Sequence, residues 1–107
     1  MKIRISEQSV RVRLSREEAQ ALCDGQTIST TLRLNTIDRF EVALQTWHLT
    51  IGEVITEASS LVISIPMAAA SKLAKENDYI FSCQQPSDSS SPLVMSVEID
   101  LQKIPNT

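Results

Sequence analysis

Hydrophobic and polar residues alternate in short stretches along this chain. Over residues 2–5 and 9–14, apolar side chains take turns with basic ones. Successive side chains of a strand point to opposite faces, so each stretch predicts a strand with an apolar face toward a core and a basic face away from it. Residues 6–9 then form a hairpin loop. Residues 27–34 and 39–47 alternate in the same way and predict two more strands.

Between these pairs of strands the spacing becomes helical. Ser15 and Glu18 fit a capping box, in which each side chain binds the other residue's backbone amide. The apolar residues that follow have i, i+3, i+4 spacing, namely Ala19, Leu22 and Cys23. Gly25 is a suitable left-handed cap. We therefore expect a helix near residues 16–24.

The second half repeats this order of elements 51 residues later. Aligned without a gap, residues 2–15 fall on residues 53–66, and the register continues through Ala19 on Ala70, Leu22 on Leu73 and Ile28 on Tyr79. Few residues are identical, so the match lies in the apolar pattern. It predicts a second hairpin across residues 57–60, a helix near 67–76, and strands over 79–85 and 93–101.

These elements predict one α+β domain over residues 1–107, a size typical of single domains. A ββαββ unit over about residues 2–47 is repeated over about residues 53–101. We expect the two units to form a pseudo-twofold pair, with two helices on a mainly antiparallel sheet or split barrel.

The composition fits a soluble globular protein, with 42% hydrophobic and 21% charged residues. The first residues lack the apolar stretch of a signal peptide, and no run approaches the length of a membrane helix. We therefore expect a cytoplasmic protein without membrane contact. Cys23 and Cys83 lack metal-ligand spacing and are expected to be buried, reduced thiols and not a disulfide.

The net charge is −3, distributed unevenly. Residues 1–52 carry seven Lys/Arg and six Asp/Glu, and the remainder three and seven. This balance disfavours nucleic-acid binding by the whole surface. The outward side chains of the first hairpin are nevertheless all basic: Lys2, Arg4, Arg11 and Arg13. Such a face could hold a phosphate or carboxylate. The alternative is a solvated strand face, neutralised by neighbours such as Glu41, Glu98 or Asp100.

In the second half the outward positions are instead mostly apolar. The set comprises Ile55, Val62, Ile80 and Val94. Strands that are apolar on both faces are normally covered on both. The second half is therefore either more central in the fold or part of a subunit interface.

No arrangement of residues in the sequence indicates catalysis, a metal or a cofactor. His48 is the only histidine, and no spacing brings a nucleophile or carboxylate to it. CxxC and HxxxH motifs are missing from the sequence. We therefore lean toward a non-enzymatic protein without catalytic residues, metal or cofactor.

The opening MKIRISEQSVRVRLSREEA resembles the start of a family of small, uncharacterised bacterial proteins, and LVISIP with its alanine-rich helix resembles that family's second block. The resemblance implies a bacterial cytoplasmic protein and supplies no activity. The expected function is that of an oligomeric or partner-binding module, through self-association or an unidentified protein partner. The alternative is an anion- or nucleotide-binding protein, or an enzyme, that uses the basic hairpin.

Overall fold

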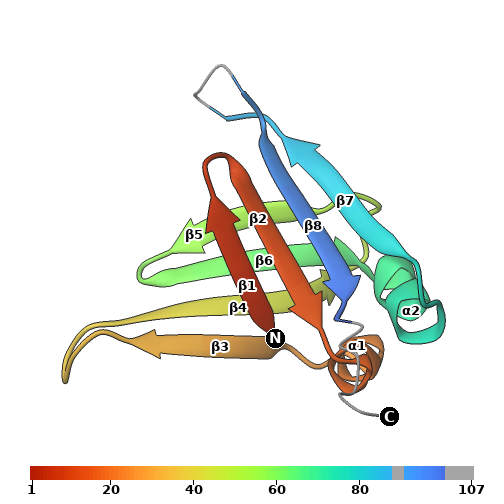
Figure 1. Ribbon diagram of the computed structural model, residues 1–107, viewed down its shortest axis with the longest axis horizontal. Helices are drawn as coiled ribbons and strands as arrows, with labels where there is room; N and C mark the ends of the chain where they lie inside the picture. Colours follow the sequence, from red (N-terminus) through yellow and green to blue (C-terminus); the bar gives the residue numbers. More distant parts are fainter. Residues whose placement is uncertain (88–90, 101–107) are drawn as a thin grey trace, which may run out of the picture.

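The computed structural model describes residues 1–87 and 91–100 of the chain, so residue 101, the predicted end of the last strand, lies outside the described residues. The described part contains two helices and eight strands (Figure 1). In chain order these are β1 (Lys2–Ser6), β2 (Ser9–Leu14), α1 (Arg16–Cys23), β3 (Ile28–Arg33), β4 (Arg39–Trp47), β5 (Glu53–Glu57), β6 (Ser60–Pro66), α2 (Met67–Lys75), β7 (Ile80–Gln85) and β8 (Leu93–Ile99). The predicted α+β class is confirmed.

The strands form two four-stranded sheets. Sheet A has the order β1-β2-β8-β7, and sheet B has the order β3-β4-β6-β5. Within each sheet two antiparallel hairpins are joined by a parallel pair, β2 with β8 and β4 with β6. Each sheet therefore takes one hairpin from each half of the chain. Both sheets are mixed, and the described strands do not close into a barrel.

The strand orders of the two sheets correspond. When each strand of sheet A is replaced by its counterpart in the other half, the order becomes β5-β6-β4-β3, which is sheet B read from the opposite edge. If the two halves are copies of one unit, their strands must be arranged in corresponding orders, as they are here. The internal repeat itself stays a prediction. The apolar outward positions of the second half were given two explanations, of which one was a more central place in the fold. This explanation is wrong, because each half contributes two edge strands and two inner strands.

The offset of 51 residues does not hold beyond the helices. Ile28 lies opposite Leu44 in sheet B, and the residue in the corresponding place of sheet A, opposite Val97, is Phe81. The expected match of Ile28 with Tyr79 is therefore wrong. Two additional residues between α2 and β7 change the offset to 53, and we use this offset for equivalent positions in β3 and β7 and in β4 and β8.

The core lies between the inward faces of the two sheets, whose strands cross one another in Figure 1. The helices lie together at one end of the sheets and add the fully buried Leu22 and Leu73. Truncating either leucine to alanine costs about 2–5 kcal/mol in a typical core. Arg16 of α1 donates hydrogen bonds to the carbonyls of Ala74 and Glu76 at the end of α2, where a cation suits the helix dipole.

Candidate functional site

The four predicted basic residues lie together on the outer face of sheet A. The register of the first hairpin places Lys2 opposite Arg13 and Arg4 opposite Arg11. The inward side chains of β2, which are Val10, Val12 and Leu14, are buried on the inner face. The four side chains line a shallow hollow of about 170 Å³. We call these residues, Lys2, Arg4, Arg11 and Arg13, the basic face.

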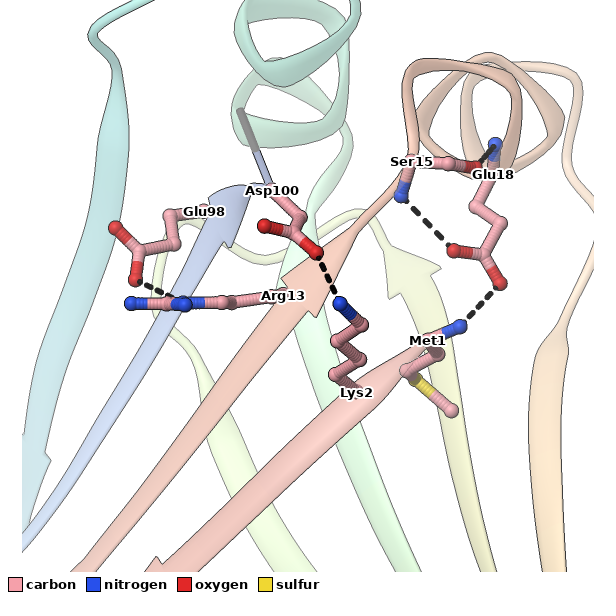
Figure 2. Close-up of polar contacts among 7 residues, drawn as sticks. All are labelled: Met1, Lys2, Arg13, Ser15, Glu18, Glu98 and Asp100. Atoms are coloured by element: carbon pink, nitrogen blue, oxygen red, sulfur yellow. Dashed lines mark hydrogen bonds and ion pairs between the residues drawn. The ribbon is translucent and has the colours of Figure 1, made fainter. Parts of the chain in front are cut away.

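Two carboxylates reach the basic face from the end of β8 (Figure 2). Glu98 Oε1 accepts a hydrogen bond of 2.7 Å from Arg11 Nε and one of 3.2 Å from Arg13 Nε. Asp100 Oδ2 lies 2.8 Å from Lys2 Nζ. The parallel pairing of β2 with β8 causes these contacts, because it places Glu98 beside Arg13. Of the three expected acidic partners, only Glu41 does not take part, because it lies on β4 in sheet B.

The carboxylates neutralise the basic face only in part. The hydrogen bond from Lys2 and the positive charges of Lys2 and Arg13 lower the pKa of Asp100. Within residues 1–87 and 91–100, Arg4 makes no ion pair. Four cations against two carboxylates leave two positive charges in excess. Like charges placed directly opposite on paired strands repel each other, so the Arg4–Arg11 pair favours an additional anion.

The predicted apolar set is divided between the two sheets. Ile55 and Val62 lie opposite each other on the outer face of sheet B. Ile80 and Val94 lie on the outer face of sheet A, but at opposite ends of the β7–β8 pair, opposite Glu98 and Gln84. The structure therefore brings together Ile55 with Val62 and does not form one patch from all four. Ile55, Ile80 and Val94 are between 39% and 55% exposed.

The histidine and the thiols lie away from the basic face. His48 is exposed just beyond β4. Cys23 and Cys83 are free thiols and only half-buried. Burial raises the pKa of both thiols, although a hydrogen bond from the Gly52 backbone opposes this rise at Cys83. In the part of the chain that the structure describes, no three metal-ligating side chains gather.

The sequence pattern did not indicate one contact that closes an edge of the fold. The side chain of Gln85 in β7 pairs with the backbone of Val54 in the edge strand β5. Val54 N donates to Gln85 Oε1, and Gln85 Nε2 donates to the Val54 carbonyl, both at 2.8 Å. The equivalent residues in the other half are Leu32 and Ile3, and leucine cannot make these bonds. An alignment with the offset of 53 would have shown this difference.

Comparison with known proteins gives the chain a family but no described relative. No curated protein and no solved structure matches the chain. In the described residues, no helix has the length and apolar character needed to cross a membrane. A sequence model of the family of unknown function DUF7009 matches residues 1–107, so the chain belongs to this family of unknown function, as its resemblance implied.

Proposed function

We propose that this chain is a non-enzymatic partner-binding module that uses its basic face to bind acidic side chains of another protein. The observation that carries this proposal is the excess of two positive charges around a hollow, where Arg4 makes no ion pair with any residue that the structure describes. A guanidinium group binds a carboxylate through two parallel hydrogen bonds, and Arg4 has these donors available for a partner. The bacterial cytoplasm stays the expected setting.

The size of the hollow favours a group presented by a partner over a whole nucleotide. Pockets for small molecules usually measure about 300–1,000 Å³ and bury most of the ligand. The hollow of the basic face measures only about 170 Å³. This space suits one carboxylate or phosphate group. The anion- or nucleotide-binding alternative, including an enzyme, therefore ranks second.

Self-association is a further candidate, supported by the outer face of sheet B. Ile55 and Val62 form an apolar pair there, and the neighbouring outward positions include Glu53 and Glu57 of β5. This face would complement the basic face of a second copy. The mass of the protein in solution, measured against concentration at low salt, tests this candidate.

The main proposal is tested with a labelled peptide rich in glutamate and, separately, with ATP. Binding is followed by fluorescence anisotropy for the peptide and by calorimetry for ATP, at about 0.01 M and 0.15 M salt, where charges are screened over about 30 and 8 Å. We expect peptide binding that weakens with salt and falls about tenfold in Arg4→Gln, the loss typical of one charge-assisted hydrogen bond. Preference for ATP would favour the second-ranked function.

Arg33→Gln is the matched control, because Arg33 is an exposed arginine at the end of β3 in the other sheet. It removes the same charge from the protein without touching the basic face. At 0.15 M salt we expect this variant to bind the peptide within about twofold of the wild type, because Arg33 does not line the hollow of the basic face and exposed charges are screened over about 8 Å. Equal losses in both variants would contradict the proposal.

A further inference from the structure

We infer that the free edge of β1 binds an extended segment of the partner, which alternates apolar and acidic residues and adds a fifth strand to sheet A. This inference deepens the proposed function, on which it rests. It depends on a difference between two equivalent edges of the fold. At one edge β5 is capped by Gln85 of β7, whereas at the other edge β1 faces no such residue from β3.

The backbone of β1 has donors and acceptors at this edge. Ser6 pairs with Ser9 across a two-residue turn, so this pair is hydrogen-bonded. From there along the hairpin, hydrogen-bonded pairs alternate with pairs that are not hydrogen-bonded. Ile5 and Ile3 then belong to pairs without hydrogen bonds, and their N–H and C=O groups point away from β2. The hydrogen bonds of Val54 support this assignment. Val54 is the equivalent of Ile3, and its backbone N–H and C=O bind Gln85, which lies outside the β5–β6 hairpin.

These backbone groups of β1 have no partner among the described residues. Within residues 1–87 and 91–100, neither Ile3 nor Ile5 takes part in a hydrogen bond outside the β1–β2 pair. A row of such groups on an edge strand is a template for another strand. β1 is five residues long, which suits a short extended segment.

An apolar surface lies beyond this edge. In Figure 1 the strands of sheet B extend past β1, so that the inner face of sheet B is left uncovered there. Leu32, which pairs with the partly buried Phe40 on that inner face, is 58% exposed, and Leu34 is 64% exposed. At the end of β1, Ile5 is 60% exposed. A strand added to β1 would place every second side chain over this surface, which favours apolar residues at those positions.

The other side chains of the added strand would lie on the outer face, next to Lys2 and Arg4. Lys2 already has Asp100, whereas Arg4 has no ion pair among the described residues. Cross-strand pairs of opposite charge stabilise a sheet, so acidic residues are favoured at these positions. The edge therefore selects an alternation of apolar and acidic residues, with the acidic side chains reaching the basic face.

A second copy of the chain is a poorer occupant than a separate acidic partner. Pairing β1 with β1 of a second copy would bring together Lys2 and Arg4 from both copies, which repel each other. The edge strand β5 carries Glu53 and Glu57 but already has its Val54 backbone bound by Gln85. Both arrangements lose contacts that an acidic segment from another protein would make.

The test compares two peptides of identical composition. In one, glutamate and valine alternate over seven residues; in the other, the same residues form a glutamate block and a valine block. A third peptide is the alternating one with the backbone amides on one edge N-methylated. We expect the alternating peptide to bind about tenfold more tightly than the block peptide, and N-methylation of the edge that faces β1 to remove this advantage.

Ile5→Pro tests the same edge from the side of the protein. Proline removes the outward N–H of Ile5 and is tolerated on an edge strand when that N–H faces solvent. We expect Ile5→Pro to bind the alternating peptide about tenfold more weakly, while Ile5→Val, which keeps the N–H and loses only one methylene of the apolar side chain, binds at most about threefold more weakly. Circular dichroism checks folding, and the N-methylated peptide decides the question if Ile5→Pro does not fold.

The outcomes separate this inference from the proposed function. Equal binding of the alternating and block peptides, weakened in both cases by Arg4→Gln, would overturn strand addition and leave the basic face as the binding site. Failure of both peptides to bind would overturn both proposals. A doubled mass without peptide, lost in Ile5→Pro, would show that a second copy occupies the edge and would overturn the occupant proposed here.

Discussion

Gln85→Leu should destabilise the protein by opening the edge between β5 and β7. Leucine has a shorter, branched side chain without hydrogen-bonding groups, so it cannot bind the Val54 backbone, which now donates to and accepts from the Gln85 amide at 2.8 Å. Val54 is only 7% exposed. Its N–H and C=O would therefore lose their partners in a place where water has poor access.

The size of the effect follows from the two lost bonds. Each hydrogen bond of this kind contributes about 0.5–1.5 kcal/mol, and an unsatisfied buried group costs about 1–3 kcal/mol. Water can approach in part, because Gln85 itself is only half-buried. We therefore expect the free energy of unfolding to fall by about 2 kcal/mol.

Urea unfolding of the wild type and the variant measures this loss, and hydrogen exchange locates it. The control is Gln84→Leu, because Gln84 is the exposed neighbour on the opposite face of β7. A surface change of this kind stays within about 0.5 kcal/mol. The Val54 amide should lose its protection from exchange only in Gln85→Leu. Equal unfolding free energies for the two variants would refute the reasoning.

Three further predictions concern other parts of the molecule. Gly52→Ala should lower stability by about 1–3 kcal/mol in calorimetry, because the new Cβ would lie 2.8 Å from Phe81 Cε2 and 2.9 Å from Cys83 Sγ, besides 2.8 Å from the more flexible Met95 Cε; an unchanged melting temperature would contradict this. Partial burial opposes ionisation of Glu18, but hydrogen bonds from the amino group of Met1 and from Ser15 outweigh it and lower its pKa below the ordinary 4.5. The ionised Glu18 therefore stabilises the protein fully above pH 4.5, and this contribution is lost as the pH falls through the lowered pKa. In urea unfolding, Glu18→Gln should destabilise the protein at neutral pH and hardly at all in strong acid. An equal loss of stability at both pH values would count against this. If the outer face of sheet B mediates self-association, Val62→Lys should reduce the mass in light scattering, and an unchanged mass and thermal midpoint would exclude that interface.

The local elements of the fold could be predicted from the sequence because their signals are local. The capping box is present, with Ser15 Oγ accepting from the Glu18 amide at 3.1 Å and the Glu18 carboxylate accepting from the Ser15 amide at 2.9 Å (Figure 2). Alternation identified the strands of the β1–β2 and β5–β6 hairpins, and the two halves share their order of elements. These features depend on neighbours a few residues apart.

The pairing between the halves could not be predicted in this way. Arg11 and Glu98 are 87 residues apart in the chain, and no local pattern indicates that β2 lies parallel to β8. Alternation placed Glu41 and Glu98 on outward positions alike, so the sequence could not distinguish between them. Only the sheet order separates them, because it assigns Glu41 to sheet B.

The difference between the edge of β5, which Gln85 binds, and the edge of β1 was missed for a related reason. Residues 2–15 match residues 53–66 without a gap, but two additional residues before β7 shift the later strands. With the offset of 51, Gln85 falls on Leu34, and its correspondence with Leu32 does not appear. Polar contacts between edge strands depend on such single positions, which the apolar pattern does not record.

Hydrogen exchange of the β1 amides, with and without the alternating acidic peptide, tests the central claim most directly. Strand addition would slow exchange at Ile3 and Ile5, whose amides point to the free edge, and would leave the Arg4 amide unchanged, because it already bonds across to Arg11. The account predicts this alternating protection along β1. Unchanged exchange at Ile3 and Ile5, with protection appearing instead around Val62 on sheet B, would contradict it.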